Sequence, residues 1–364
     1  MDIKQLDSAY IANTYARFDL CLAHGRGSLV YDEKGKEYID LGGGIAVNTF
    51  GFCDDEWTAA VTSQLGALQH ASNLYYTSPQ VNLAQLLCEK TGMKKVFFGN
   101  SGAEANECAI KAARKYSSDK FGGERNVIIT LKNSFHGRTV TTLSATGQDV
   151  FHKDFGPFTG GFVYAEANNI DSVKTLISGN NVCAVMMELI QGEGGVLVLN
   201  RDFVFDVQQL CDDNDILLII DEVQTGNGRT GELYCYMNYG IHPDIVTTAK
   251  GLAGGLPLGA TLFSEKTQGV LGSGSHGSTF GGNPVCAAGA LNILQRLDEP
   301  LMKRVKAKSE YIVSELTGAT GIKSISGIGL MLGIETERPA KEVVLWCIEN
   351  GVIPLTAKNK VRLL

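Results

Sequence analysis

Short apolar runs alternate with longer amphipathic stretches through the middle of the chain. Seven runs are predicted to be strands, because they are short and rich in β-branched or other apolar residues: 94–100, 126–131, 160–166, 181–190, 216–223, 244–250 and 258–264. Such runs suit parallel strands that helices cover on both faces. Two intervening stretches, 101–117 and 202–214, carry apolar residues at helical spacing. The alternation predicts an α/β domain built on a mostly parallel sheet of seven strands.

The two ends of the chain have a different pattern. Residues 27–44 alternate apolar and polar positions around a turn at Lys34-Gly35, which predicts an antiparallel hairpin. Towards the other end we predict helices at 286–297 and 300–318, a strand at 327–335, a helix at 341–351 and a last strand at 360–364. We therefore expect a large domain at 46–300 and one small α+β domain made of 1–45 and 301–364.

Composition narrows the class of protein. The 364 residues carry a formal net charge of −7 and nine cysteines without metal-finger spacing. The negative charge argues against a nucleic-acid partner, because phosphate binding needs clustered Lys and Arg. An odd number of scattered cysteines suits free thiols in a reducing compartment. Neither a signal peptide nor an apolar segment of the ~20 residues that a membrane helix needs is recognisable. We expect a cytoplasmic protein without a membrane partner or a metal site.

A lysine and an aspartate stand where two predicted strands open into loops. The run 216–223 delivers Asp221 near its carboxyl end, and Lys250 closes the run 244–250. Taken alone, Lys250 is equally well explained as a surface lysine, and Asp221 as an acid that caps a turn. Together they suit pyridoxal 5'-phosphate, because a lysine amine forms a Schiff base with its aldehyde and an acid pairs with its ring nitrogen. We predict Lys250 and Asp221 as the catalytic pair of a pyridoxal-phosphate enzyme.

At these residues the chain resembles the class III, fold-type I aminotransferases. The resemblance runs from about Tyr31 to the last residue and involves several separate motifs. It implies the fold-type I pyridoxal-phosphate transferase fold and a homodimer with active sites at the subunit interface. It also implies that the small domain is incomplete, because members of the family continue past the last strand with a Pro-rich turn and a helix.

The segment after the first predicted strand is a candidate phosphate site. Free N–H groups at the start of a helix attract phosphate, and the resemblance implies that Ser101, Gly102 and Ala103 hold the cofactor phosphate. An ordinary turn, with Ser101 as helix N-cap and Glu104 in the first helical turn, explains the same residues.

The segment after the second predicted strand contains an aromatic residue and an arginine. The resemblance implies that Phe135 covers one face of the pyridoxal ring and that Arg138 binds a substrate carboxylate, which a guanidinium can grip through two hydrogen bonds. A core phenylalanine and a solvated arginine are the commoner fates of these residue types. We expect His136 to be a hydrogen-bonded structural group without a proton-transfer role.

Two glutamates accompany the fourth predicted strand. Paired acids occur in glycosidases, but the lysine context and the resemblance favour another assignment. The resemblance implies that Glu193 forms a switchable ion pair with Arg362 of the last strand, and that Gln224 bonds the ring hydroxyl. It places Glu188 near the cofactor as an anchor, with a strand-end cap as an almost equally good interpretation.

One further residue is assigned by resemblance alone. Residues 272–277 match the dinucleotide pattern GxGxxG, but no strand leads into them and no helix follows, so the match is accidental. The resemblance implies instead that Thr279 donates to the cofactor phosphate of the neighbouring subunit.

The amino donor is the least determined part of the prediction. Ornithine aminotransferases typically place a tyrosine near the position of Gly44, and this chain has none there. The small residue at this position leaves space in the predicted site, and that space favours an N-acylated donor. We expect transfer of the δ-amine of N-acetyl-L-ornithine to 2-oxoglutarate, giving N-acetyl-L-glutamate 5-semialdehyde and L-glutamate, as in arginine biosynthesis. Succinylornithine, succinyl-diaminopimelate, ornithine and γ-aminobutyrate remain alternative donors, and a mutase or decarboxylase on the same fold remains an alternative activity.

One stretch departs from the family pattern. The chain has Phe52-Cys53-Asp54-Asp55 where members usually carry a His-x-His-Pro-like segment. We expect this stretch to change loop packing rather than chemistry.

Overall fold

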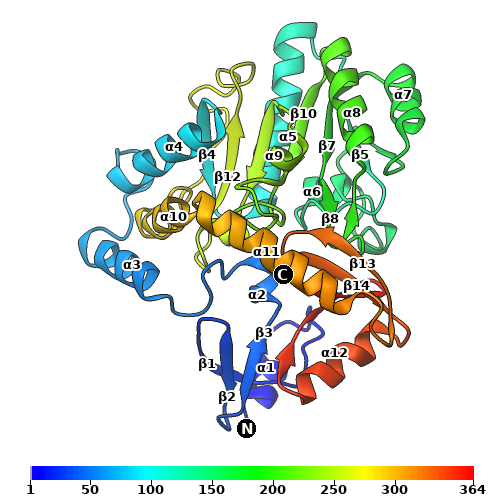
Figure 1. The fold of residues 1–364 in the computed structure, drawn as a ribbon. Helices are drawn as coiled ribbons and strands as arrows, with labels where there is room; N and C mark the ends of the chain where they lie inside the picture. The colour runs from blue at the N-terminus through cyan, green and yellow to red at the C-terminus, as the bar shows by residue number, and fades with distance from the viewer. Residues whose placement is uncertain (1) are drawn as a thin grey trace.

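The computed structural model describes residues 2–364, and its centre is a seven-stranded sheet (Figure 1). The strand order is β4-β12-β11-β10-β7-β5-β6. β12 is antiparallel to both of its neighbours, and the other six strands share one direction. The strands are β4 (Lys95–Gly99), β5 (Val127–Leu131), β6 (Phe162–Ala165), β7 (Val182–Met187), β10 (Leu217–Asp221), β11 (Ile245–Thr248) and β12 (Gly259–Phe263). The seven predicted strands and the mostly parallel sheet are confirmed.

Helices cover both faces of this sheet, which is why its strands are apolar on both sides. On β10, Leu217 and Ile219 belong to one core, together with apolar residues of α5 (Gly102–Phe121). The alternate positions, Leu218 and Ile220, belong to a second core with residues of α8 (Arg201–Asn214). The two helices predicted between the strands are therefore confirmed, and they lie on opposite faces.

Smaller elements surround the central layers. α3 and α4 both pack on α10, and β8 and β9 form a short hairpin after β7. These elements are α2 (Gly43–Ala46), α3 (Asp55–Ala67), α4 (Ser78–Thr91), α6 (Val140–Ala145), α7 (Ile170–Gly179), α9 (Cys235–Tyr239), α10 (Pro284–Arg296), β8 (Ile190–Gln191), β9 (Leu197–Val198), and the 3-10 turns η1 (Asp149–Phe151) and η2 (Lys250–Leu252).

The unusual stretch before α3 fixes that helix to α10. Asp54 is the N-cap of α3 and accepts a hydrogen bond from Trp57 N at 3.0 Å. Its two oxygens also accept from Nη1 and Nη2 of Arg296, at 2.5 and 3.0 Å. The Arg296 hydrogen bond lowers the pKa of Asp54 despite partial burial. The stretch therefore has a packing function at the junction of two helices.

Segments from both ends of the chain share one sheet. Its order is β1-β2-β3-β15, in which β15 from the C-terminal part pairs in parallel with β3. A second sheet, β13-β14-β17-β16, lies beside it with α11 and α12 (Figure 1). The hairpin predicted around Lys34-Gly35 is confirmed as β2 and β3, whereas the domain limits near 45 and 300 stay a prediction. The elements are α1 (Ile3–Tyr10), β1 (Leu22–Arg26), β2 (Leu29–Asp32), β3 (Glu37–Asp40), α11 (Glu299–Leu316), β13 (Ile322–Ile328), β14 (Met331–Thr336), α12 (Ala340–Glu349), β15 (Val352–Ile353), β16 (Leu355–Ala357) and β17 (Lys360–Leu363).

One predicted strand is wrong in its extent. Residues 327–335 were expected to form a single strand, but the chain turns at Gly329, whose φ is 60°. The turn separates β13 from β14, and the two pair as a hairpin. A left-handed glycine ends a strand that its apolar neighbours would otherwise continue.

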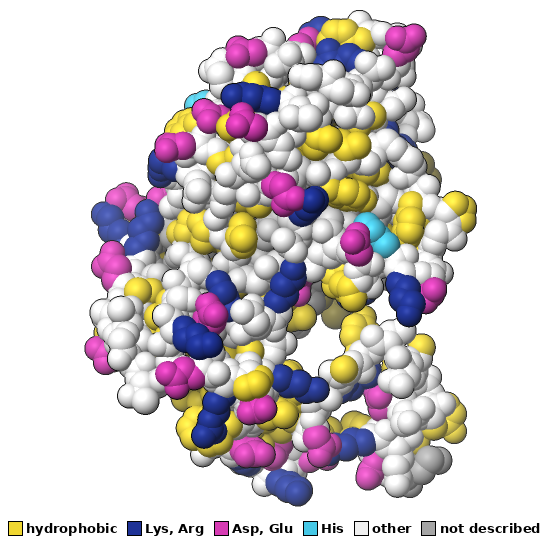
Figure 2. All heavy atoms as spheres, turned by 90° about the vertical axis from the view of Figure 1, so that its right-hand side faces the viewer, with side chains coloured by type: hydrophobic (Ala, Val, Ile, Leu, Met, Phe, Trp, Pro, Cys, Tyr) yellow, Lys and Arg dark blue, Asp and Glu magenta, His cyan; other side chains and the backbone are white. Residues whose placement is uncertain are grey.

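The surface carries charges of both signs. On the face that Figure 2 shows, basic and acidic side chains are interspersed among apolar ones. Among residues 2–364, no helix combines the length and apolar character that crossing a membrane requires. The same residues contain no group of three His, Cys, Asp or Glu side chains placed to hold a metal ion.

Candidate active site

The carboxyl ends of parallel strands meet at one edge of the sheet, and ligands bind at such edges in α/β folds. A cavity of about 490 Å³ lies among the loops that follow β4, β5, β7, β10 and β11. Nine of the twelve predicted site residues line it: Ser101, Gly102, Ala103, Phe135, Arg138, Glu188, Asp221, Gln224 and Lys250. The sheet topology therefore brings together residues that the sequence presents as separate motifs.

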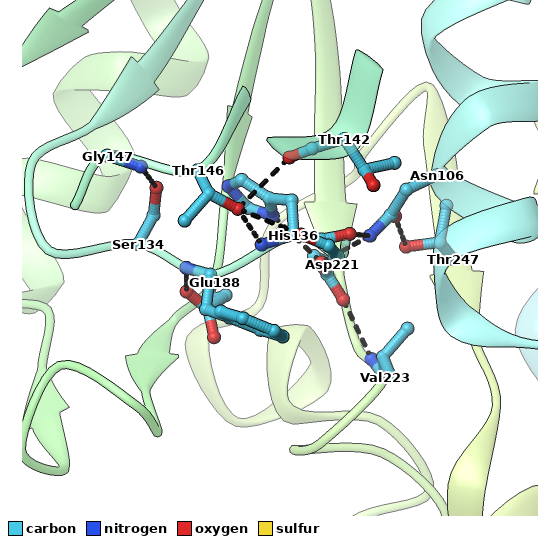
Figure 3. Close-up of polar contacts among 12 residues, drawn as sticks. Asn106, Ser134, His136, Thr142, Thr146, Gly147, Glu188, Asp221, Val223 and Thr247 are labelled. Carbon is cyan, nitrogen blue, oxygen red and sulfur yellow. Dashed lines mark hydrogen bonds and ion pairs between the residues drawn. The ribbon is translucent and has the colours of Figure 1, made fainter. Parts of the chain in front are cut away.

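Asp221 ends β10 and is only 3% exposed. Its Oδ2 accepts a hydrogen bond from Asn106 Nδ2 at 2.8 Å and lies 2.8 Å from His136 Nδ1 (Figure 3). Its Oδ1 accepts from Val223 N at 3.0 Å. A carboxylate offers about four acceptor positions. Three neighbours thus hold Asp221 in one orientation and leave acceptor capacity for a further donor.

His136 is oriented towards Asp221 by its own environment. Its backbone N donates to Thr146 Oγ1 at 3.0 Å. Its Nδ1 faces a carboxylate, which only accepts, so the tautomer with the proton on Nδ1 fits the site. The Nε2 atom is buried and has no hydrogen-bond partner among residues 2–364, and a proton there would lack an acceptor. His136 is therefore a hydrogen-bonded group of the kind that the sequence predicted.

Asn106 is the residue near this aspartate that sequence reasoning missed. It is 1% exposed on α5, and Thr247 Oγ1 of β11 donates to its Oδ1 at 2.7 Å. Asparagine is disfavoured inside helices because its side chain competes for backbone groups. An asparagine on the buried stripe of α5, next to Ala105, was the signal that could have identified it.

Lys250 follows β11 in a strained conformation. Its φ is 49°, in the left-handed region that residues other than glycine rarely adopt. The carbonyls on both sides are held, since Ala249 O accepts from Asn227 Nδ2 at 3.1 Å and Gly251 O accepts from Thr49 Oγ1 at 2.7 Å. Burial lowers the pKa of the Lys250 amine, which enlarges the uncharged, nucleophilic fraction near neutral pH.

The start of α5 combines both interpretations of its sequence. Ser101 is the N-cap, and its Oγ accepts from Glu104 N at 3.1 Å. The N–H groups of Gly102 and Ala103 have no acceptor within the helix. A Cβ atom on Gly102 would lie 2.6 Å from Val223 Cγ1. The predicted N-cap is confirmed. The free N–H groups belong to residues that line the cavity, but their role in holding phosphate stays a prediction.

Phe135 and Arg138 lie together on one wall of the cavity. The Arg138 guanidinium carbon is 5.6 Å from the Phe135 ring centroid and 4.7 Å from that of Phe151. Arg138 is exposed. A guanidinium stacked on aromatic rings keeps its N–H edge available, so Arg138 can bind a carboxylate of a ligand.

Glu188 lies deep in the same cavity. Its Oε2 accepts from Phe135 N at 2.8 Å, and the side chain is almost fully buried. Burial, and then the charge of Asp221, raise the pKa of Glu188 well above its usual value. The direction of this shift favours the protonated form of Glu188.

Glu193 and Arg362 form the predicted ion pair. Arg362 Nη1 lies 2.7 Å from Glu193 Oε1 and donates to Gln224 Oε1 at 3.1 Å. Burial acts to raise the pKa of Glu193, but the charge and hydrogen bond of Arg362 outweigh it and leave that pKa below its usual value. Neither Glu193 nor Arg362 lines the cavity. Gln224 does line it, and Gln224 connects the ion pair to the cavity.

Thr279 lies outside this cavity. It is exposed in the loop between β12 and α10. The neighbouring Ser278 is attached to the cavity rim, because its Oγ accepts from Asn100 Nδ2 at 3.0 Å. The structure thus places Thr279 on the surface beside the site, and its role towards a second subunit stays a prediction.

Comparisons with known proteins agree with this geometry. Residues 10–364 match the family model of the class-III aminotransferases. Acetylornithine aminotransferase of Haemophilus ducreyi is 52% identical over 100% of this chain and 93% of its own length. Succinylornithine transaminase of Yersinia pseudotuberculosis is 43% identical over 97% of this chain and 89% of its own.

Solved structures show the same fold. The ornithine aminotransferase of Toxoplasma gondii superposes with a TM-score of 0.94 at 32% identity, over 99% of this chain and 88% of that one. The similarity spans the central sheet, the cavity and the terminal segments together. The chain belongs to the class-III aminotransferases, which are pyridoxal-phosphate enzymes of fold type I.

Proposed function

We propose that the cavity transfers the δ-amino group of N-acetyl-L-ornithine to 2-oxoglutarate, giving N-acetyl-L-glutamate 5-semialdehyde and L-glutamate. One observation supports this most. Lys250 and Asp221 share a cavity with the exposed Arg138 and with Gln224, which contacts the Glu193–Arg362 pair. One available and one masked arginine suit a site that must accept first a ligand with one carboxylate and then a ligand with two.

The residues present fit pyridoxal 5'-phosphate. This group supplies an aldehyde that condenses with primary amines and a ring that accepts electrons. Lys250 offers the amine, and Asp221 keeps acceptor capacity for a ring N–H. Gly102 at the start of α5 packs directly against Val223, where a Cβ would clash, and it stands beside N–H groups that suit a phosphate.

Lys250 has two tasks in this proposal. Its amine holds the cofactor at rest and gives way to the amine of the donor. The released amine would then accept a proton from the donor carbon that loses its amino group and return it to the former aldehyde carbon of the cofactor. The lowered pKa of Lys250 serves the second task, because a protonated amine cannot accept a proton.

The two arginines would act at different stages. Arg138 binds the carboxylate of N-acetylornithine while Glu193 neutralises Arg362. When 2-oxoglutarate enters, Glu193 turns aside, Arg362 binds one carboxylate and Arg138 binds the other. While Glu193 neutralises Arg362, the negative charge of Glu193 disfavours binding of a second anionic group beside Arg362.

N-succinyl-L-ornithine is a second candidate donor, favoured by the 43% identity to a succinylornithine transaminase. The succinyl group adds a methylene group and a carboxylate to the acyl chain, and a methylene alone contributes only ~1–3 kcal/mol in a pocket. A steady-state comparison of kcat/KM for the acetyl and succinyl donors, with succinyl-diaminopimelate, ornithine and γ-aminobutyrate beside them, ranks the candidates. A higher value for any other donor would replace N-acetylornithine in the proposal.

The reaction type is tested by separating its two halves. With the purified holoenzyme, N-acetylornithine alone should bleach the yellow absorbance of the bound cofactor, and 2-oxoglutarate should restore it. Lys250→Ala should lose that absorbance and reduce turnover by more than about 10³-fold. A mutase or decarboxylase would turn over the donor without this cycle, and wild-type turnover by Lys250→Ala would rule out the proposed role.

We also infer a cytoplasmic homodimer. Exposed apolar residues gather near the loop of Thr279, including Leu74, Tyr76 and Phe280. Asn73 joins the two segments by donating to Ser278 O at 3.1 Å. An apolar surface beside the cavity suits a second subunit that completes the site. All nine cysteines are free, which suits a reducing compartment. A sedimentation measurement that finds only monomers would contradict the dimer.

A further inference from the structure

Asn106 connects three separate elements around Asp221. It lies on α5, while Asp221 ends β10 and Thr247 belongs to β11. Its Nδ2 donates to Asp221 Oδ2 at 2.8 Å and to His136 O at 2.7 Å (Figure 3). All four side chains are buried. The side-chain amide of Asn106 therefore links the members of a polar network that lies between apolar layers.

The orientation of this amide is determined by its partners. The carbonyl of His136 and the carboxylate of Asp221 only accept, so the amide nitrogen must face them. The amide oxygen faces Thr247 Oγ1, which donates to it at 2.7 Å. A flipped amide would oppose acceptor to acceptor at two contacts. Thr247 therefore supports the orientation that the two acceptors impose on Asn106, and Asn106 helps to hold Asp221.

We propose that Asn106 is a positioning residue that holds the Asp221 carboxylate charged and aimed for the cofactor ring. The inference rests on the proposed function, because it needs the cofactor in this cavity. A hydrogen bond from a neutral amide to a carboxylate is charge-assisted and stabilises the negative charge. Because Asn106 adds no charge of its own, it leaves the charge of Asp221 available to a positively charged ring.

An acid at position 106 would have the opposite effect. Asn106→Asp keeps the shape but replaces the donor by a second carboxyl group within hydrogen-bonding distance of Asp221. Two carboxylates at that distance do not both ionise, so they share a proton and weaken the hold on the ring. Asn106→Ala removes one of the three groups that hold Asp221 and leaves His136 as the remaining partner of its Oδ2.

The experiment compares Asn106→Asp, Asn106→Ala and Thr247→Val with the matched control Thr261→Val. Thr261 also bonds α5 from a neighbouring strand, since its Oγ1 donates to Ala105 O at 2.8 Å, but it does not contact Asp221. Each apoprotein is titrated with pyridoxal 5'-phosphate, the absorbance of each holoenzyme is followed against pH, and kcat and KM are measured. Thermal unfolding reports the fold.

We expect both Asn106 variants to bind the cofactor on the order of 10- to 100-fold more weakly, the size of a lost hydrogen bond to a charged group. Their kcat should fall more than their KM for 2-oxoglutarate changes, and the pH profile of the absorbance should shift. Thr247→Val should show a smaller effect in the same direction, and Thr261→Val should match the wild type.

Three results would overturn the inference. One is wild-type affinity and an unchanged pH profile in Asn106→Asp. Another is an equal loss in Thr261→Val, because that would indicate helix packing alone. The third applies if Asn106→Ala does not fold: wild-type cofactor affinity and an unchanged pH profile in Thr247→Val. Failure of the wild type to bind the cofactor would instead refute the proposed function.

Discussion

Arg362 Nη1 lies 2.7 Å from Glu193 Oε1, although the two residues are 169 positions apart in the sequence. Arg362 is 3% exposed, and its Nε has no hydrogen-bond partner among residues 2–364. A buried guanidinium needs an anion. The carboxylate of Glu193 supplies one now, and a carboxylate of a ligand could replace it while also reaching the unpaired Nε.

Arg362→Ala should mainly impair the reaction with 2-oxoglutarate. Truncating one partner of a buried charge pair costs about 2–5 kcal/mol, so kcat/KM for this acceptor should fall on the order of 10²-fold. Single-turnover reaction with N-acetylornithine should change by less than about threefold, because Arg362 is masked at that stage. Equal losses in the two half-reactions would contradict the switch.

Arg138→Ala should impair both half-reactions. Arg138 stacks on Phe135 and Phe151 and is exposed towards ligands, and both ligands present a carboxylate to it. We expect a loss on the order of 10- to 100-fold in each half, the size of a lost charge-assisted contact. The same half-reaction measurements check it, and a loss confined to one half would require another residue to hold the common carboxylate.

Gly102→Ala should weaken cofactor binding. A Cβ at this position would lie 2.6 Å from Val223 Cγ1, so either the helix start or the Asp221 loop must move. Overpacking of this kind costs about 1–3 kcal/mol, which predicts a Kd for pyridoxal 5'-phosphate raised about 5- to 150-fold. Gly66→Ala is the matched control, because its Cβ would meet nothing within 4 Å. Similar affinities in the two variants would argue against close packing at the start of α5 as a requirement for cofactor binding.

The central sheet could be predicted because its signal is local. Each strand is a short apolar run, and β10 alternates between two buried faces without any polar interruption before Asp221. The terminal sheets were predicted less well, because their strands are short and half-buried. The turn at Gly329 depends on a backbone conformation that apolar periodicity does not reveal.

The residues of the site likewise fall into those that local sequence patterns reveal and those that they do not. Lys250, Asp221 and the turn at Ser101 stand at strand ends, so their motifs could be located from sequence. Asn106 stands out only as a polar residue on the buried stripe of α5, and its role could not be located, because its partner Asp221 lies 115 residues away and only the packing of α5 on the sheet brings them together. The left-handed turn at Ile45, whose φ is 65°, also escaped sequence reasoning, since a β-branched residue is among the least expected there.

The stability of the apoprotein should depend on pH through Glu222. This residue is fully buried, and its oxygens accept from Thr225 Oγ1 at 2.5 Å and Tyr236 N at 2.7 Å. Burial raises the pKa of Glu222 from 4.5 to about 7, although these hydrogen bonds oppose the shift. The folded protein therefore retains a proton that the unfolded chain has lost. The stabilisation is complete below about pH 4.5 and is lost as the pH rises to about 7.

Glu222→Gln should remove this dependence, because an amide oxygen can still accept from Tyr236 N and the amide nitrogen can donate to Thr225. The free energy of unfolding of the variant, relative to the wild type, should rise by about 2–3 kcal/mol between pH 5 and pH 8. Urea titrations at both pH values measure it, with Glu310→Gln on the exposed face of α11 as the control. A difference that stays constant with pH would mean that Glu222 is already ionised at pH 5 in the folded protein, with the surrounding donors outweighing its burial.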